Sequence, residues 1–372
     1  MKRDYRIDIV KGIGIFLVVL AHAGCPISKY INLFHMALFF IAAGYCYNVS
    51  YSKDLSSLFN LVKKRMKSLY IPYVLYMTVF VIFHNLFFTL FIYTNNPNFS
   101  NGVLGNTYGV LQKYTVIEEL KNLVKTWLFS SSEQLGGAAW FVKVLFVITI
   151  LWAILLFIFK NQHFKNKLLI ISLVSCLMLV FGYFLNVKNI TLKFGLSSVC
   201  TCFFMFSVGC LFRIYYKKIS NFLYGSLYKS ILCIIGNIFI LFWVGHYEHV
   251  AIAVNKYNNP LLLIIVSISG WFLIWSIAEL LNNFTWNQKI VYIGQHTLPI
   301  LFLQFLAFKL VTLIQIQIFH LDSYHLASFP TYRTDSGWWI LYTFAGITVP
   351  LLTEYIFRMF IHILKIKRKA KK

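Results

Sequence analysis

The sequence predicts an all-α integral membrane protein, a polytopic bundle of about ten transmembrane helices. Three observations lead to this fold class. The 372 residues are 59% hydrophobic and only 12% charged, with a mean hydropathy of +0.71, and a soluble protein of this size could not bury so much apolar surface. Apolar runs of about 20 residues recur along the chain, which is the length that an α-helix needs to cross a bilayer. The basic residues fall mainly on alternate connecting loops.

The charge distribution predicts the orientation of these helices. The spans are predicted near residues 7–24, 33–50, 69–93, 139–159, 168–186, 194–212, 230–247, 260–281, 290–318 and 338–360. With the N-terminus inside, 24 of the 34 Lys and Arg residues lie on inner segments or their flanks, and 8 lie on outer loops. Cytoplasmic loops are enriched in Lys and Arg, so both termini are predicted to be cytoplasmic. The net charge of +23 therefore reflects membrane orientation, and nucleic acid is not expected as a partner.

The chain is predicted to form a single transmembrane domain over residues 1–372. The first span has no small-residue cleavage site and is expected to remain as a helix. Residues 94–138 form the largest extracytoplasmic loop, and KYTVIEELKNLVKTWLFSS within it has apolar residues at helical spacing. This pattern predicts an amphipathic helix that lies on the outer membrane surface or covers a cavity. Residues 361–372 form a basic tail expected against anionic lipid headgroups.

Two functional candidates lie in the first apolar segment, IDIVKGIGIFLVVLAHAG. Ionisable residues inside a membrane are costly, so they usually serve a function. Eleven helical residues rotate by three turns plus about 20°, which places Lys11 and His22 on one face, roughly 16 Å apart along the axis. Asp8 is a helical neighbour of Lys11. The structural alternative is an Asp8–Lys11 pair at the interface and a His22 bonded to a neighbouring helix.

The second segment, NLFHMALFFIAAGYCY, adds His35 near its outer end. A short link containing Pro26 joins the first two spans into a hairpin. His22 and His35 are therefore expected near the same end of that hairpin, where they could approach each other. A histidine is the commonest general base because its ordinary pKa lies near the working pH. The alternative for His35 is a packing or interfacial role.

The inner loop LVKKRMKSLYIPY carries Lys64, Arg65 and Lys67 before Pro72 opens the next helix. These cations suit phosphate oxygens, so the loop could clamp a phosphorylated donor. The alternative is a topology signal that touches lipid phosphates.

The segment GGAAWFVKVLF places Trp140, Phe141 and Lys143 at the start of a span. Trp140 and Phe141 are also typical of the aromatic belt of membrane proteins, and Lys143 could snorkel outward. An interfacial position is expected for Lys309. The seven cysteines show no spacing typical of a disulfide framework or a zinc site, so no metal site is predicted.

Together these segments resemble the acyltransferase 3 family of bacterial integral membrane acyltransferases, over most of the chain. The opening segment is similar to the family's motif of Arg or Lys, ten residues and His, matched by Lys11 and His22. Further similar segments follow in the family's order: INLFHMALFFIAAGY, KKRMKSLYIPY, AAWFVKVLF, FFMFSVGCLFR with Arg213 at its cytosolic end, and YIGQHTLPILFL. The sequence departs from the family pattern after Arg65, where Ser68 stands in place of a second Arg, and at Gln304, where many members carry His.

The resemblance implies a multi-pass protein of the bacterial plasma membrane that moves an acetyl group from cytosolic acetyl-CoA to a hydroxyl of a cell-envelope glycan. It implies no permanently bound cofactor, with acetyl-CoA as the acyl donor. The expected catalytic residues are His22 and His35. The expected donor- or substrate-binding residues are Asp8, Lys11, Lys64, Arg65, Lys67, Trp140, Phe141, Lys143 and Arg213. A transporter or flippase of envelope glycan precursors remains the alternative function, and a homo-oligomer remains open.

Overall fold

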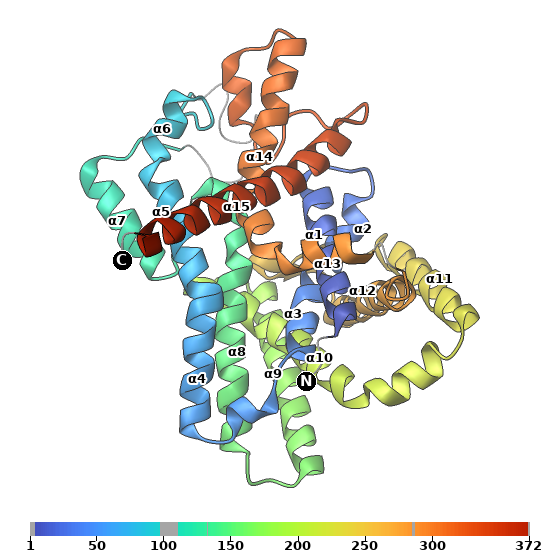
Figure 1. Ribbon diagram of the computed structural model, residues 1–372. Coiled ribbons are helices and arrows are strands. Elements are labelled where there is room, and N and C mark those ends of the chain that lie inside the picture. Colours follow the sequence, from blue (N-terminus) through green and yellow to red (C-terminus); the bar gives the residue numbers. More distant parts are fainter. Residues whose placement is uncertain (1–3, 97–110, 132, 285–286, 371–372) are drawn as a thin grey trace. The chain divides into compact units, whose positions relative to one another are not determined.

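The computed structural model describes residues 4–96, 111–131, 133–284 and 287–370, and these residues are mainly helical (Figure 1). The strands β1 (Val250–Ala251) and β2 (Lys256–Tyr257) form a short antiparallel pair. Seven helical stretches of the described chain are long and apolar enough to cross a membrane: Gln134–Ile158, Phe164–Val187, Lys193–Leu223, Leu227–Val244, Pro260–Leu281, Thr297–Ile318 and Trp338–Ile363. The predicted all-α polytopic class is confirmed. The number of ten spans and the cytoplasmic termini stay predictions.

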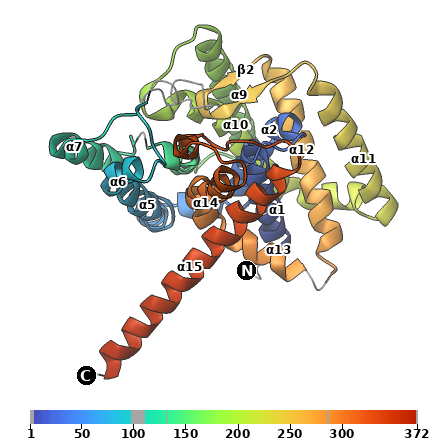
Figure 2. The same cartoon turned by 90° about the horizontal axis from the view of Figure 1, so that it is seen from above.

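The chain divides into two compact units, of which unit 1 comprises Met1–Val18, Ile27–Leu75 and Ala139–Gln295. Helix α10 packs against α3, α8 and α9. Helix α11 packs against α12, as Figure 2 also shows. The elements of unit 1 are α1 (Tyr5–His22, which continues into unit 2), α2 (Ser28–Asn32), α3 (His35–Tyr45), η1 (Val49–Ser52), α4 (Leu55–Arg65), η2 (Met66–Tyr70), α8 (Trp140–Ile158), α9 (Phe164–Val187), η5 (Lys193–Gly195), α10 (Leu196–Leu223), α11 (Leu227–Val244), η6 (Ile252–Val254), α12 (Pro260–Leu281) and α13 (Asn287–Gln295), with the two strands.

Unit 2 comprises Val19–Pro26, Tyr76–Ala138 and His296–Lys372. Helix α14 packs against α15 and against the short helix η7. The elements of unit 2 are α5 (Ile71–Ile82, which begins in unit 1), α6 (His84–Thr89), α7 (Val116–Trp127), η4 (Gln134–Ala139), α14 (Thr297–Ile318), η7 (Ser323–Ala327) and α15 (Trp338–Ala370).

Helix α7 lies within the outer loop for which the sequence predicts an amphipathic helix. It starts with a capping box in which the Thr115 hydroxyl accepts from the Glu118 backbone N–H, and the Glu118 carboxylate accepts from that of Thr115. Such a box satisfies N–H groups that have no partner inside the helix. Its apolar side chains are exposed: Val116, Ile117, Leu120, Val124 and Trp127, with Leu128 directly after the helix. Its place on the outer membrane surface stays a prediction.

Some predicted spans are divided into two helices, and proline contributes to one of these breaks. Residues 290–318 form α13 and α14, which are separated at His296. Pro299 follows within the first turn of α14, where its missing N–H costs nothing but its ring disfavours a helix that runs through from α13. The predicted span 69–93 likewise contains α5 and α6, which separate at Phe83.

Two glycines allow α3 and α10 to cross with their backbones in contact. A Cβ atom on Gly44 would lie 2.0 Å from the Phe206 carbonyl oxygen, and a Cβ on Gly209 would lie 1.9 Å from that of Ile41. Both distances are far below van der Waals contact, so only glycine fits at either position. Close approach at small residues is a main source of stability between helices in membranes, where apolar burial gives no driving force. This crossing fixes the end of α3 against α10.

The guanidinium group of Arg6 is held at the start of α1 by a carboxylate that precedes the helix. Arg6 Nε and Nη2 donate to the two oxygens of Asp4 at 2.9 and 3.0 Å, and the Tyr45 hydroxyl donates to Asp4 Oδ2 at 3.0 Å. Burial by itself would raise the pKa of the Asp4 carboxyl. The hydrogen bonds and charge of Arg6, with the hydroxyl of Tyr45, outweigh burial and hold this pKa below its ordinary value. Asp4 is therefore kept ionised and links α1 to α3.

The same guanidinium group reaches a second carboxylate on α12. Arg6 Nη1 donates to Glu279 Oε1 at 3.0 Å and contacts the Tyr216 hydroxyl. Glu279 Oε1 also accepts from the Tyr216 hydroxyl at 2.6 Å and from Trp275 Nε1 at 2.9 Å. Charge-assisted bonds of this kind are stronger than neutral ones. We call Asp4, Arg6, Tyr45, Tyr216, Trp275 and Glu279 the Arg6 network, which joins α1, α3, α10 and α12.

We predict that Glu279→Gln destabilises unit 1. The change leaves Arg6 with one carboxylate instead of two and weakens the bonds from Tyr216 and Trp275, which should cost about 1–3 kcal/mol. The thermal unfolding midpoint of purified protein in detergent should fall. Glu119→Gln on α7, the same chemical change outside the Arg6 network, is the control. Equal midpoints for the two variants would show that the network adds nothing to stability.

Candidate functional site

His22 is the last residue of α1 and lies in unit 2, where its ring contacts α14. Its Nδ1 lies 3.0 Å from Gln304 Oε1, and its ring packs on Phe305 with centroids 4.9 Å apart. Gln304 Nε2 donates to the Leu301 carbonyl at 3.1 Å, so the amide orientation leaves Oε1 to accept from His22 Nδ1–H. This hydrogen bond selects the tautomer whose Nε2 carries the lone pair. His22 Nε2 is therefore the nitrogen able to accept a proton.

Lys309 lies one helical turn after Phe305 on α14. The sequence suggests an interfacial position for Lys309, which stays a prediction, and the structure adds that its side chain is enclosed by protein, with only 3% exposed. Its ammonium group donates to the carbonyl oxygens of Leu326 at 3.0 Å and Ser328 at 2.6 Å. These carbonyls replace the water that a buried charge loses. Lys309 thereby ties the segment around η7 to α14, and Phe329 of that segment packs on Phe305 at 4.7 Å.

Several predicted donor-binding cations of unit 1 gather around Cys46, which directly follows α3. The charges of Lys11, Arg213, Asp8 and Arg65 all act on its thiol, so each of these side chains lies within electrostatic range of Cys46. Three of the four are cations, and Cys46 itself is exposed. We call these residues the Cys46 cluster. Its net positive charge suits an anionic group.

Asp8 and Lys11 are set in the Cys46 cluster by close packing of α1 on α13. A Cβ on Gly294 would lie 1.9 Å from the Asp8 carbonyl oxygen, and a Cβ on Gly12 would lie 2.3 Å from that of Ile290. Asp8 is buried, and its carboxylate lies 4.0 Å from Lys11 Nζ. The predicted pair of helical neighbours is thus present.

Arg213 is placed in the same cluster by the end of α3. Its Nη1 donates to the carbonyl oxygens of Tyr45 at 3.2 Å and Tyr47 at 2.8 Å. The last carbonyls of a helix have no partner inside the helix, so Arg213 supplies a missing donor.

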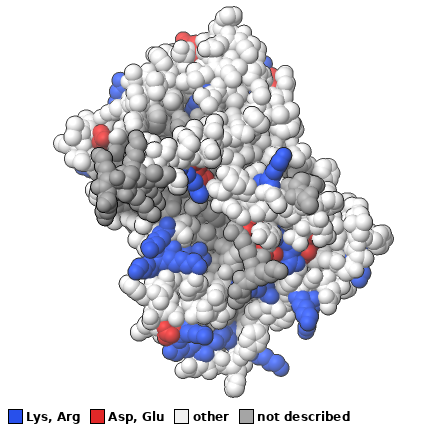
Figure 3. Space-filling model, viewed as in Figure 1, with Lys and Arg blue, Asp and Glu red and all other residues white. Residues whose placement is uncertain are grey.

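A basic hollow adjoins α4. Its volume is about 390 Å³, and its walls are Asn60, Lys63, Lys64, Lys67 and Ser68. Lys64 Nζ donates to the Tyr51 hydroxyl at 2.7 Å. The π-helical turn η2 follows Arg65 directly, and such turns recur at functional sites. On the face drawn in Figure 3, Lys and Arg side chains gather over the part of unit 1 that contains α4, α8 and α9.

The remaining predicted residues of unit 1 lie at the starts of α3 and α8. His35 is buried, and its Nδ1 lies 2.9 Å from the Ile31 carbonyl oxygen, so Nδ1 carries the proton. Trp140 and Phe141 pack on Phe40, with ring centroids 6.3 and 5.0 Å away. Lys143 lies beside the start of α10, where a Cβ on Gly195 would be 3.8 Å from its Nζ. His22 belongs to unit 2, and its predicted approach to His35 stays a prediction.

Sequence reasoning missed a buried polar cluster in unit 2. His84 Nδ1 lies 3.0 Å from Glu133 Oε1, and Nε2 lies 2.9 Å from the Gln112 carbonyl oxygen. Glu133 also accepts from the hydroxyls of Tyr93 at 3.1 Å and Tyr114 at 2.9 Å. Both ring nitrogens of His84 face hydrogen-bond acceptors. No local pattern signals this cluster, because its members are up to 49 positions apart.

Unit 2 thus offers an imidazole nitrogen able to accept a proton, and unit 1 offers side-chain cations of the kind that suit an anion. A general base or nucleophile and a phosphate-binding site suit transfer of a group from a phosphorylated carrier. None of the curated proteins and none of the solved structures compared with the chain matches it. A family model for the Acyltransferase domain of the acyltransferase 3 family matches residues 4–355. That match covers nearly the whole chain, and the protein belongs to the acyltransferase 3 family of membrane acyltransferases.

Proposed function

We propose that the protein is an O-acetyltransferase of the bacterial plasma membrane. It takes the acetyl group from cytosolic acetyl-CoA and transfers it to a hydroxyl of a cell-envelope or exported polysaccharide, or of its lipid-linked precursor. The observation that carries this proposal is on α1, which is one unbroken helix from Tyr5 to His22. The helix bears Lys11 of the Cys46 cluster and His22, whose Nε2 carries the lone pair while Nδ1–H donates to Gln304. The helix rise separates Lys11 and His22 by roughly 16 Å, which a thin pantetheine arm can span.

The cations of unit 1 would bind the phosphates of the donor. Arg65, Lys11 and Arg213 lie within electrostatic range of Cys46, and the hollow beside α4 adds Lys64 and Lys67. A coenzyme A molecule carries phosphate groups at its nucleotide end, and Lys and Arg bind such oxygens through charge-assisted hydrogen bonds. This assignment places the negatively charged part of the donor beside the Cys46 cluster and the hollow at α4.

The proposed transfer step uses His22 as a general base. His22 Nε2 takes the proton of the acceptor hydroxyl while that oxygen attacks the thioester carbonyl carbon. The carbon–sulfur bond then breaks, and the coenzyme A thiolate takes the proton from the imidazolium ring, so CoA-SH and an acetyl ester are formed. In the alternative order, Nε2 attacks the thioester carbonyl carbon and the carbon–sulfur bond breaks, which leaves an acetyl-imidazolium and the coenzyme A thiolate. The acceptor hydroxyl then attacks the acetyl carbon, the carbon–nitrogen bond breaks, and the hydroxyl proton goes to the thiolate. His35 is proposed to orient the acceptor or share in proton transfer.

We predict that His22→Ala abolishes most transfer without preventing membrane insertion. Loss of an acid–base group should lower the rate of acetyl transfer by roughly 100-fold or more. Radiolabelled acetyl transfer by purified protein in liposomes is the measurement, and His246→Ala, at an exposed histidine after α11, is the control. Near-normal transfer by well-expressed His22→Ala would refute the role of His22. Normal glycan movement without acetyl-CoA consumption would instead support a transporter.

Gln304 is predicted to be a positioning residue for His22. In Gln304→Leu, His22 Nδ1–H loses its acceptor and the ring can adopt either tautomer, so transfer should fall by about tenfold to 100-fold, less than in His22→Ala. Gln304→Glu restores an acceptor for Nδ1–H and should recover part of the activity, with the acidic limb of the pH–rate profile moved to higher pH. A merely structural role of Gln304 would leave that limb unmoved.

We predict that Lys64→Gln together with Arg65→Gln weakens donor binding. One lost charge-assisted contact costs about 1.5–3 kcal/mol, which corresponds to roughly 10- to 150-fold weaker binding of acetyl-CoA. Calorimetry on purified protein measures this change. The control is Lys217→Gln with Lys218→Gln, which removes the same charge from an exposed pair on α10.

Labelling of the Cys46 thiol gives an independent measurement of acetyl-CoA binding at the same site. Acetyl-CoA should protect its thiol from a negatively charged thiol reagent in the parent protein, and the double variant should need a higher acetyl-CoA concentration for the same protection. Cys46→Ser identifies the labelled position. Unchanged affinity together with unchanged protection in the double variant would assign the loop to membrane orientation alone.

A further inference from the structure

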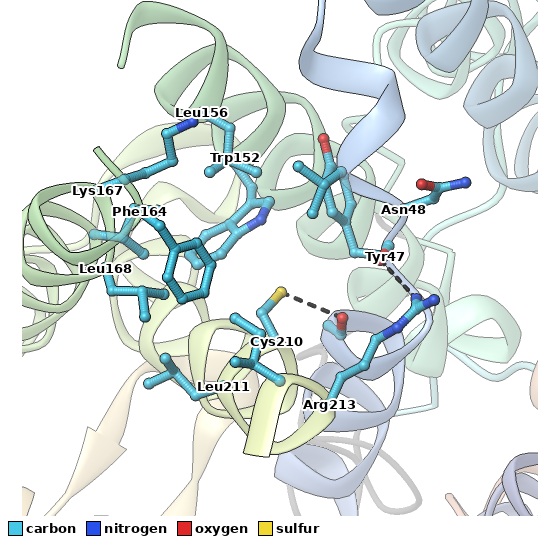
Figure 4. A pocket seen from close by; sticks show the side chains of 14 residues that line it. Tyr47, Asn48, Trp152, Leu156, Phe164, Lys167, Leu168, Cys210, Leu211 and Arg213 are labelled. Atoms are coloured by element: carbon cyan, nitrogen blue, oxygen red, sulfur yellow. Dashed lines mark hydrogen bonds between the residues drawn. The ribbon is translucent and has the colours of Figure 1, made fainter. Parts of the chain in front are cut away.

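Unit 1 contains a pocket of about 360 Å³ lined by α8, α9 and α10 and, at the end of α3 and after it, by Gly44, Tyr47, Asn48 and Val49 (Figure 4). Helices α8 and α9 both pack against α10, and the pocket lies in the wedge between them. Trp152 and Leu156 line it from α8, Phe164 and Leu168 from α9, and Leu211 from α10. These walls are apolar, so the pocket suits a hydrocarbon chain.

The edge of the pocket is basic. Lys167 and Arg213 both belong to its lining. Lys167 Nζ donates to the Lys160 carbonyl oxygen at 3.1 Å, while Arg213 is bonded to the end of α3. Lys160 and Lys165 lie close by in sequence and are exposed. An apolar pocket with these basic side chains at and near its lining matches a molecule with an apolar tail and an anionic head.

The pocket adjoins surface that would face lipid. Helix α9 is a candidate membrane span, and its exposed side chains Leu169, Leu173, Leu177 and Val180 are apolar. In a membrane such side chains contact lipid acyl chains. Leu168, which lines the pocket, directly precedes the exposed Leu169, so the same turn of α9 supplies a pocket wall and lipid-facing surface.

We propose that this pocket binds one anionic phospholipid, with an acyl chain between Trp152, Phe164 and Leu168 and the phosphate group beside Lys167. Basic pockets between membrane helices bind anionic lipid headgroups. An acyl chain would fill an apolar space that water does not favour. Trp152 Nε1 is buried and has no hydrogen-bond partner among the described residues, and a lipid ester carbonyl is an acceptor of the type it lacks. The bound lipid would brace α8 against α9.

Native mass spectrometry of the purified full chain in detergent tests the proposal, with phosphatidylglycerol and phosphatidylcholine as probes. The parent protein should retain phosphatidylglycerol preferentially. Leu168→Trp fills the pocket and should abolish this retention. Leu169→Trp places the same indole on the lipid-facing side and should leave retention unchanged.

A second pair of variants tests the headgroup contact without changing the apolar walls. Lys167→Gln should lower the preference for phosphatidylglycerol by about fivefold, since one Lys near an anionic membrane surface contributes about 1 kcal/mol. Lys165→Gln, which removes the same charge outside the pocket, should retain the preference. Equal lipid retention by all four variants and the parent would overturn the proposal.

Acetyl-CoA binding is the remaining measurement, because the pocket could instead belong to the donor site. Acetyl-CoA binding, measured by calorimetry on the same proteins, should be equal in Leu168→Trp and Leu169→Trp. Selective loss of acetyl-CoA binding in Leu168→Trp, with phosphatidylglycerol retained, would overturn the lipid assignment and place the pocket in the donor site. Because lipid retention requires no acetyl transfer, failure of the proposed enzymatic function would leave this measurement unaffected.

Discussion

The ion pairs of Arg6 are the interaction on which much of unit 1 depends. In a membrane, apolar contacts alone discriminate little between alternative arrangements of helices, because lipid tails are as apolar as leucine side chains. Arg6 binds carboxylates on both sides, Asp4 before α1 and Glu279 on α12, and aromatic hydroxyls from α3 and α10 complete the set. A charge in this setting is costly unless every partner is in place. The Arg6 network therefore favours the one arrangement of four helices in which all its members are paired.

Two glycine contacts then bring the candidate residues of unit 1 together. The crossing at Gly44 and Gly209 sets the end of α3, with Cys46, beside α10 and Arg213, while Gly12 and Gly294 hold α1 on α13. Lys11 of α1 also belongs to the Cys46 cluster. The cluster consists of residues from separate helices, and its existence depends on how closely their backbones approach.

The sequence was sufficient to predict the membrane class, the acyltransferase family and the presence of a helix in the outer loop. Hydrophobic run lengths, charge asymmetry and motif order are properties of the sequence itself and require no knowledge of tertiary contacts. The role of Gln304 could not be predicted, since the sequence shows only a departure from a family pattern and not the 3.0 Å bond to His22. The burial of Lys309 was also missed, because its acceptors are backbone carbonyls of Leu326 and Ser328, whose positions no residue type reveals.

Arg213 has an electrostatic consequence for any anion near α3. The carboxyl end of a helix carries about half a negative charge from its aligned peptide dipoles and would by itself repel phosphate. Arg213 binds the carbonyl oxygens of Tyr45 and Tyr47 at this end and offsets that negative potential. The guanidinium group thus makes the unfavourable terminus of a helix compatible with an anionic ligand, and it would do so even if it never touched the ligand.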